Sequence, residues 1–242
     1  MGARTQFSEA LCEKRVRKVH QYLRTDVRSN NTFLKRPFIF EFTGTPSAGK
    51  TTTITELDKF FRRMGLRVLR PQEGAEVIRH IERTAPLYNI RTALYAVSQL
   101  VDHAHSHTYD LILFDRCAFD PYCWMMYWEE KGRLSSEEKK LYQDFFLSPF
   151  WASYIDGAYF MICDAEIAIQ RELKIALSRK LGGTTNPESI RMLEGLYRRA
   201  YKQLRGRFPQ LKLFNATHLD ERRMVEIISD QVLSIMENKS AM

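Results

Sequence analysis

The sequence predicts an α/β fold in which a five-stranded parallel sheet carries helices on both faces. Two observations predict it: five short strand-like runs are bounded by turn residues, and helical stretches separate them along the 242 residues. Strands and helices that alternate in this way build βαβ units, and hence a parallel sheet in three layers. Hydrophobic residues make up 44% of the chain, which is enough to cover such a sheet within one domain.

The expected strands are short runs of strand-forming residues between turn signals. The run at 37–42, PFIFEF, is typical of a buried parallel strand, and the run at 109–115, YDLILFD, is the most apolar. We expect strands at 37–42, 66–71, 109–115, 157–164 and 211–217. Parallel sheets bind ligands at the carboxyl ends of their strands. Those ends fall at or next to Gly44, Glu73, Asp115, Asp164 and Thr217.

Helices are expected between these strands, and stop signals delimit them. Gly65 ends the first as a C-cap residue, Pro86 stops the second, and Ser135 opens a capping-box pattern later in the chain. We expect helices at 51–65, 73–86, 89–108, 118–147 in two parts, 165–177, 189–208 and 219–236. A basic amphipathic pattern over 8–27 predicts one further helix, so that residues 1–36 form an N-terminal helical extension and 37–242 the main domain.

A phosphate-binding loop is predicted between the first strand and the next helix. Residues 44–51, GTPSAGKT, fit the pattern G-x-x-x-x-G-K-[ST] in its required strand-to-helix context. A triphosphate must be wrapped by backbone N–H groups, so the glycines permit the tight turn and the helix adds its positive N-terminal end. Lys50 would reach the β- and γ-phosphates. A plain glycine turn with a chance lysine is the alternative. We expect the nucleotide at Gly44, Thr45, Pro46, Ser47, Ala48, Gly49, Lys50, Thr51 and Thr52.

A metal site is predicted where the third strand ends. The apolar run LILF at 111–114 leads directly into Asp115 and Arg116. In phosphate-binding folds a carboxylate at this place holds Mg²⁺, often through water, together with the hydroxyl of the phosphate loop. We therefore expect Thr51 and Asp115 to hold the metal. The alternative is a surface Asp–Arg pair that caps a strand.

These motifs resemble the nucleoside and nucleotide kinase group of P-loop proteins, which includes deoxynucleoside kinases and thymidylate kinases. The likeness spans about 38–217. It implies a three-layer P-loop NTPase fold with strand order 2-3-1-4-5, in which ATP and its acceptor face each other across the carboxyl edge of the sheet. Cys117 stands where the thymidylate kinase form has Tyr, and the phosphate loop lacks the acidic residue that many thymidylate kinases place inside it.

The resemblance also implies roles for residues outside the phosphate loop. Arg116 would act on the acceptor side, and Glu73 lies where deoxynucleoside kinases keep the carboxylate that removes the acceptor hydroxyl proton. Glu73 fits equally well as a first-turn acid of the next helix, and Glu76 is its nearby competitor. The loop after the fifth strand packs on adenine in related kinases, which makes Asn215 a candidate contact.

A basic run after the fourth strand falls at the lid of this kinase group. Residues 169–183 are IQRELKIALSRKLGG, and arginines on a mobile segment would balance the charge of the transferring phosphoryl group. We expect a lid-like segment over about 171–187. Arg171 and Arg179 are the expected phosphate partners, because a guanidinium pairs bidentately with phosphate oxygens. The alternative is a solvated helix face on which Arg171 pairs with Glu172.

The prediction is therefore an ATP- and Mg²⁺-dependent kinase that moves the γ-phosphoryl group to a small acceptor, a nucleoside or a nucleotide. The absence of the GTPase base-reading pattern N-K-x-D favours ATP. The expected catalytic residues are Lys50, Glu73, Asp115, Arg116, Arg171 and Arg179.

Charge and cysteine content leave other functions open. The net charge of +8, the basic N-terminal helix and the run LYRRAYKQLRGR also suit an ATP-switched regulatory or nucleic-acid-binding module. A kinase that acts on an RNA end, a protein or another hydroxyl is a further alternative.

The sequence predicts a cytoplasmic protein without a membrane segment. It has four scattered cysteines, no apolar run of about 18 residues and no secretory signal. The choice between a monomer and a homodimer stays open.

Overall fold

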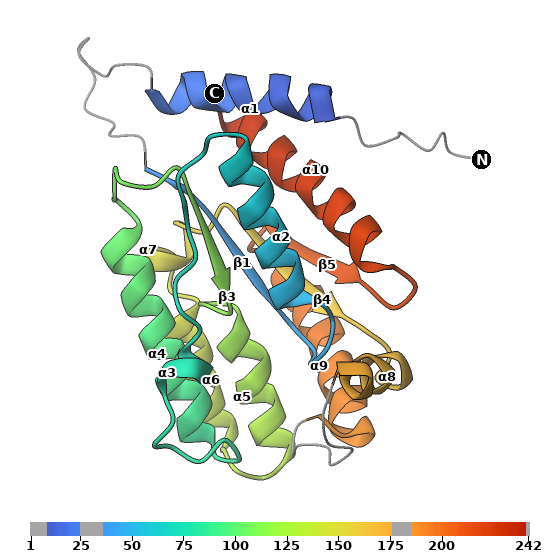
Figure 1. Cartoon of the computed structure of the whole chain (residues 1–242). Coiled ribbons are helices and arrows are strands. Elements are labelled where there is room, and N and C mark those ends of the chain that lie inside the picture. Colours follow the sequence, from blue (N-terminus) through green and yellow to red (C-terminus); the bar gives the residue numbers. More distant parts are fainter. Residues whose placement is uncertain (1–8, 25–35, 176–184, 241–242) are drawn as a thin grey trace.

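The computed structural model describes residues 9–24, 36–175 and 185–240, and it confirms the predicted α/β architecture (Figure 1). Parallel strands form one five-stranded sheet in the order β2-β3-β1-β4-β5, which is the order implied by the resemblance. The strands are β1 Phe38–Gly44, β2 Val68–Leu69, β3 Leu111–Asp115, β4 Gly157–Ile162 and β5 Leu211–Asn215.

Strand β1 is central, and all of its residues are buried. It pairs with β3 on one side, where Phe42 lies opposite Asp115, and with β4 on the other, where Gly44 lies opposite Met161. This register brings the end of β3 and the loop that follows β1 to the same edge of the sheet.

Helices cover both faces of the sheet. On one face, Phe40 and Phe42 of β1 share a hydrophobic cluster with α1 Glu9–Arg24, α2 Lys50–Arg63 and α10 Glu221–Ser240. On the other, Ile39 shares a cluster with α4 Pro86–His103, α5 Asp120–Glu130 and α9 Pro187–Leu204. Alternate residues of β1 thus pack against opposite helical layers, because successive side chains of a strand point to opposite faces of the sheet. Shorter or flanking helices are α3 Gly74–Val77, α6 Ser136–Phe146, α7 Pro149–Ala152 and α8 Ala165–Ile175.

The helix expected at 73–86 is mostly wrong. Helix α3 ends at Val77 because Ile78 adopts extended backbone angles (φ −88°, ψ 92°) and buries its side chain in the core. Pro86 does not stop a helix but begins α4, where its missing N–H breaks no helical hydrogen bond. The strand expected at 66–71 shortens to Val68–Leu69, and α7 was not expected.

The capping box predicted at Ser135 is confirmed. The Ser135 hydroxyl accepts a hydrogen bond from the Glu138 amide at 3.1 Å, and the Glu138 carboxylate accepts one from the Ser135 amide at 2.8 Å. Two otherwise unpaired amides at the start of α6 are thereby satisfied.

Helix α1 lies against α10 (Figure 1). Val16 and Val19 are buried, and the Arg15 guanidinium donates to Asp230, Ser234 and Glu237 of α10 at 2.6–2.8 Å. Helix α1, the described helix of the predicted N-terminal extension, is therefore packed onto α10. Within the described ranges, no helix combines the length and the apolar character needed to cross a membrane.

Candidate active site

The phosphate-loop glycines occupy positions that disfavour a side chain. Gly44 has φ +144°, and a Cβ there would lie 1.7 Å from the Met161 carbonyl oxygen. Gly49 has φ +88°, and a Cβ there would lie 2.5 Å from Met224 Cε. Ser47 at the tip of the loop also has a positive φ, 54°. The backbone is thus bent tightly between β1 and α2, the shape in which amides surround a phosphate.

Lys50 begins α2 and turns its side chain back over the loop. Its Nζ donates to the carbonyl oxygens of Thr45 at 2.8 Å and Gly44 at 3.3 Å, and the residue is 7% exposed. Burial lowers the pKa of Lys50 to about 8, and the positive charge of Arg116 acts in the same direction. The ammonium therefore lies at the centre of the loop, beside the N-terminus of a helix that favours anions.

Thr51 and Asp115 meet at the edge of the sheet. The Thr51 hydroxyl donates to Asp115 Oδ2 at 2.6 Å. Asp115 Oδ1 is buried and has no hydrogen-bond partner among the described residues. A hydroxyl and a carboxylate with an unsatisfied oxygen are the hard oxygen donors that Mg²⁺ takes. The residues present fit the predicted metal.

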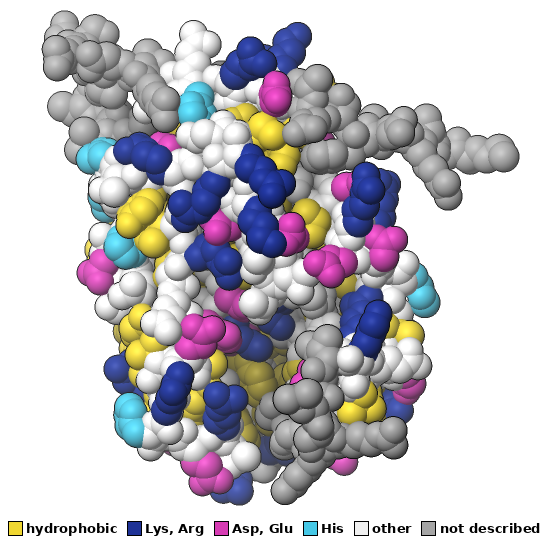
Figure 2. All heavy atoms as spheres, viewed as in Figure 1, with side chains coloured by type: hydrophobic (Ala, Val, Ile, Leu, Met, Phe, Trp, Pro, Cys, Tyr) yellow, Lys and Arg dark blue, Asp and Glu magenta, His cyan; other side chains and the backbone are white. Residues whose placement is uncertain are grey.

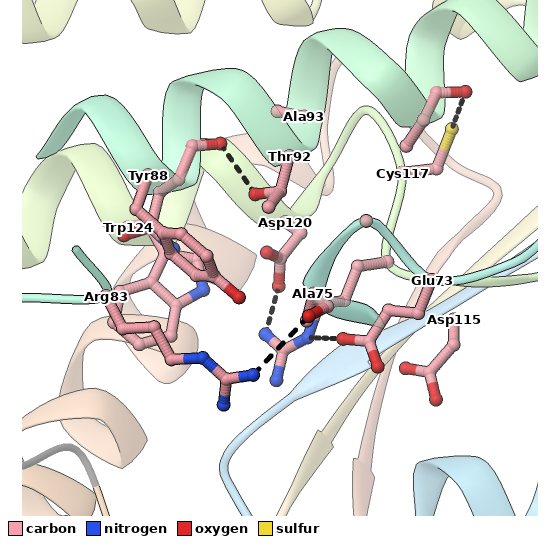
Figure 3. A pocket seen from close by; sticks show the side chains of 14 residues that line it. Glu73, Ala75, Arg83, Tyr88, Thr92, Ala93, Asp115, Cys117, Asp120 and Trp124 are labelled. Carbon is pink, nitrogen blue, oxygen red and sulfur yellow. Dashed lines mark hydrogen bonds and ion pairs between the residues drawn. The ribbon is translucent and has the colours of Figure 1, made fainter. Parts of the chain in front are cut away.

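Arg116 lies between two carboxylates. Its Nε donates to Glu73 Oε1 and its Nη1 donates to Asp120 Oδ1, both at 3.0 Å (Figure 3). Burial lowers the pKa of Arg116, but the negative charges of Asp120 and Glu73 raise it by more. The pKa of Arg116 is therefore raised overall, and the guanidinium stays protonated. Burial raises the pKa of Glu73 above its ordinary value, Arg116 opposes that shift, and Asp115 adds to it. A carboxylate with a raised pKa is suited to accept a proton.

A cavity of about 250 Å³ opens beside this cluster. Figure 3 shows Asp115 and Glu73 at one end of it, Tyr88, Trp124 and Arg83 at the other, and Asp120 between them. Trp124 is only 6% exposed and nevertheless lines the cavity. The hollow itself is visible in the lower half of Figure 2. Acidic groups at one end and aromatic rings at the other suit a molecule with hydroxyls and a flat apolar part.

Glu76, the competitor of Glu73, lies outside this cavity. It is exposed and lines a neighbouring groove, whereas Glu73 lines both the cavity and that groove. Of the two carboxylates, only Glu73 lines the cavity beside Asp115.

The structure describes one of the two arginines expected in the lid, Arg171, and its role as a phosphate partner stays a prediction. The Arg171 guanidinium does not pair with Glu172 but donates to the carbonyl oxygens of Ala216 at 2.8 Å and Leu219 at 2.9 Å, so it braces the loop between β5 and α10. Glu172 instead accepts a hydrogen bond from the Ser47 hydroxyl at 2.7 Å. Arg179 lies outside the described residues.

Asn215 is exposed at the end of β5, and its side-chain oxygen accepts hydrogen bonds from both the amide (3.0 Å) and the hydroxyl (2.7 Å) of Thr217. This oxygen therefore shapes the turn that follows the strand. Its role as an adenine contact stays a prediction.

Sequence reasoning missed a buried acid in β1. Glu41 is fully buried, and its carboxylate accepts hydrogen bonds from the amides of Cys117 at 2.8 Å, Phe119 at 3.0 Å and Asp120 at 3.0 Å. Burial raises the pKa of Glu41 to about 7, although the amide bonds oppose this. A signal was present, since an ionisable residue inside the apolar run FIFEFTG needs partners in the core.

A network around Asp120 was missed as well. Asp120 Oδ1 accepts from the hydroxyls of Thr43 and Tyr197 in addition to Arg116, and the two hydroxyls lie 3.0 Å apart. Because Thr43 and Tyr197 lie far from Asp120 in sequence, no local pattern pointed to their contact.

Comparisons with known proteins agree with this fold. The sequence profile of a family described as an AAA domain matches residues 40–180. The fold resembles that of deoxyadenosine kinase from M. mycoides with the products dCMP and a flexible dCDP bound (TM-score 0.59, 20% identity, 81% of this chain and 100% of that chain). The same enzyme with bound dCTP gives a TM-score of 0.58 at 20% identity, again over 81% and 100%. With bound dATP the TM-score is 0.57 at 20% identity, over 80% and 98%. None of the curated proteins matches this chain in sequence.

Proposed function

The chain belongs to the AAA domain family of P-loop proteins, and from this premise we propose that it is a kinase that uses ATP and Mg²⁺. The acceptor is the hydroxyl group of a nucleoside or a nucleotide. The observation that carries the proposal is the cavity that opens beside Thr51 and Asp115, with Glu73 and Arg116 in its wall. A nucleotide switch needs the phosphate loop, but it does not need a second enclosed space next to the γ-phosphate.

The proposed reaction follows from what each side chain does. The loop amides and Lys50 bind the phosphates, and Thr51 and Asp115 would hold Mg²⁺, which shields the charge of the β- and γ-phosphates. The acceptor oxygen forms a bond to the γ-phosphorus while the bond from that phosphorus to the bridging oxygen breaks, so ADP leaves. Glu73 takes the hydroxyl proton, and Arg116 neutralises charge on the acceptor side.

The fold likeness supports the acceptor class. The M. mycoides protein is a deoxyadenosine kinase, and its structures hold deoxynucleotides. We propose the same class of acceptor here, because the aromatic end of the cavity offers Tyr88 and Trp124 to a base, and the acidic end offers Glu73 and Asp120 to sugar hydroxyls.

A transfer assay with labelled ATP tests the proposal. The full chain is incubated with γ-labelled ATP, Mg²⁺ and, in separate reactions, nucleosides, nucleoside monophosphates and RNA with a free 5′-hydroxyl end. We expect label on one nucleoside or nucleotide class, and ADP release that depends on that acceptor. ADP release without any acceptor, or salt-sensitive RNA binding without transfer, would favour the regulatory or nucleic-acid-binding alternatives instead.

Two carboxylate variants sharpen the same assay. Glu73→Gln removes the proposed proton acceptor, and we expect kcat to fall roughly a hundredfold or more. Glu76→Gln is the matched control, because that exposed side chain lies outside the cavity, and we expect its kcat to stay at the wild-type value. Equal losses in both variants would contradict the role of Glu73.

A further inference from the structure

Helix α5 receives its N-terminal cap from a neighbouring strand. Its own N-cap residue, Phe119, has no capping side chain, and Pro121 in its first turn has no N–H. The carboxylate of Glu41 accepts hydrogen bonds from the amides of Cys117, Phe119 and Asp120 instead. A negative group at this end also complements the helix dipole. A residue of β1 thus replaces the cap that the local sequence of α5 lacks.

Segment 116–120, which Glu41 holds in this way, begins with a residue in a strained backbone conformation. Arg116 has φ +66°, in the left-handed region that non-glycine residues rarely adopt. Its amide donates to the carbonyl oxygen of Phe42 at 2.9 Å, and the Thr43 hydroxyl donates to Asp120. Residues 41–43 of β1 therefore hold the whole of segment 116–120. Phe42 binds its first residue, Glu41 binds the amides of 117, 119 and 120, and Thr43 binds the side chain of its last residue.

Arg116 and Asp120 are the two ends of this segment, and both line the acceptor cavity. We propose that Glu41 is a positioning residue, whose carboxylate holds segment 116–120 so that Arg116 and Asp120 face the acceptor. The inference rests on the proposed kinase function. We expect Glu41 to affect the acceptor side of the site but not the phosphate loop. Lys50 is held by the carbonyl oxygens of Gly44 and Thr45 and not by segment 116–120.

Hydrogen exchange measured by mass spectrometry tests the holding role without an acceptor. Glu41→Gln keeps the size of the side chain but loses its charge and places an NH₂ group among N–H donors. At pH 8, above the pKa of Glu41 of about 7, the wild-type carboxylate is ionised. We expect the amides of Cys117, Phe119 and Asp120 to exchange roughly tenfold faster in the variant. Exchange in α2 should not change.

Leu204→Ala is the matched control. Leu204 is 5% exposed and belongs to the same hydrophobic cluster as α5, so its truncation destabilises the core, while it has no bond to segment 116–120. A rise in exchange at 116–120 in Glu41→Gln but not in Leu204→Ala supports the proposal. Unchanged exchange, or the same rise throughout the chain in both variants, would overturn it.

Kinetics give the second readout. For the acceptor found in the transfer assay, we expect Glu41→Gln to raise the KM roughly tenfold and to leave the Kd for ATP unchanged. A merely structural role would lower the active fraction and leave both constants as they are, as Leu204→Ala should. An unchanged acceptor KM in Glu41→Gln overturns the proposal. If the wild-type chain labels no acceptor, the kinase function fails, whereas the exchange measurement still decides whether Glu41 holds the segment.

Discussion

The phosphate loop takes its residues from one continuous stretch, 44–52, whereas the cavity beside it, where we propose that the acceptor binds, collects side chains from separate parts of the chain. The loop is shaped by backbone angles at Gly44 and Gly49. The cavity is shaped by contacts between side chains, such as those that join Arg116 to Glu73 and Asp120. The bend of the phosphate loop is therefore determined mainly by local sequence, whereas the cavity on the acceptor side is determined by the tertiary fold.

This difference separates the consequences of substitution on the two sides. A change on the phosphate side should affect every reaction that uses ATP, because all of them share the same loop. A change on the acceptor side should affect only the acceptor that contacts it. Three further variants or conditions test this separation.

The largest effect is expected at Lys50. Lys50→Ala removes the buried cation of the phosphate loop, and we expect kcat to fall roughly a thousandfold with every acceptor, because phosphoryl transfer depends on charge stabilisation. Lys59→Ala is the control, since Lys59 lies on the same helix but is half-exposed and pairs with Glu56. Steady-state kinetics measure both. A loss confined to one acceptor would break the separation of the two sides.

A smaller and selective effect is expected at Arg83. This exposed residue lines the cavity, and its guanidinium carbon lies 5.9 Å from the centre of the Tyr88 ring. We expect Arg83→Ala to raise the KM for nucleoside monophosphates roughly tenfold, because a guanidinium pairs with phosphate, and to leave the KM for nucleosides unchanged.

Arg79→Ala serves as the control for Arg83. Arg79 is also exposed, and its guanidinium donates to the carbonyl oxygen of Glu76 outside the cavity. Equal changes of KM for nucleosides and for monophosphates in Arg83→Ala would show that the side chain does not read the acceptor phosphate.

The smallest effect is a pH dependence on the phosphate side. Burial lowers the pKa of Lys50 to about 8, so in the nucleotide-free protein the ammonium loses its proton as the pH rises through that value. The charge that we propose attracts ATP is then present below pH 8 and lost above it. We expect the Kd for ATP, measured by calorimetry, to rise several-fold between about pH 7 and pH 9. Lys50→Met should bind ATP weakly and without this dependence, and an equal dependence in that variant would assign the titration to another group.

The parts of the molecule that sequence predicted are those with a local physical cause. The strand order followed from the resemblance, the loop at Gly44 from a fixed spacing, and the capping box at Ser135 from a pattern of four residues. The carboxylate at Asp115 followed from its place at the end of an apolar strand. Except for the strand order, which came from the resemblance, neighbouring residues determine each of these features.

The parts that sequence did not predict depend on contacts between distant residues. Glu41 caps helix α5 by accepting a hydrogen bond from the amide of Asp120, which lies 79 residues later in the sequence. The Tyr197 hydroxyl donates to the side chain of the same Asp120, which lies 77 residues before it. The guanidinium of Arg171 is engaged by a carbonyl oxygen 45 residues away. The helix expected at 73–86 failed for a related reason, since burial of Ile78 in the core outweighed the helical pattern.

The contact between Met224 and Gly49 places the last helix in the wall of the phosphate loop. During synthesis on the ribosome, residues 44–51 emerge early, but this wall emerges only when α10 begins to leave the exit tunnel. A nascent chain that stops before residue 224 carries the whole nucleotide-binding motif without the side chain that encloses it. The phosphate loop is thus enclosed only late in translation, although its own residues are synthesised early.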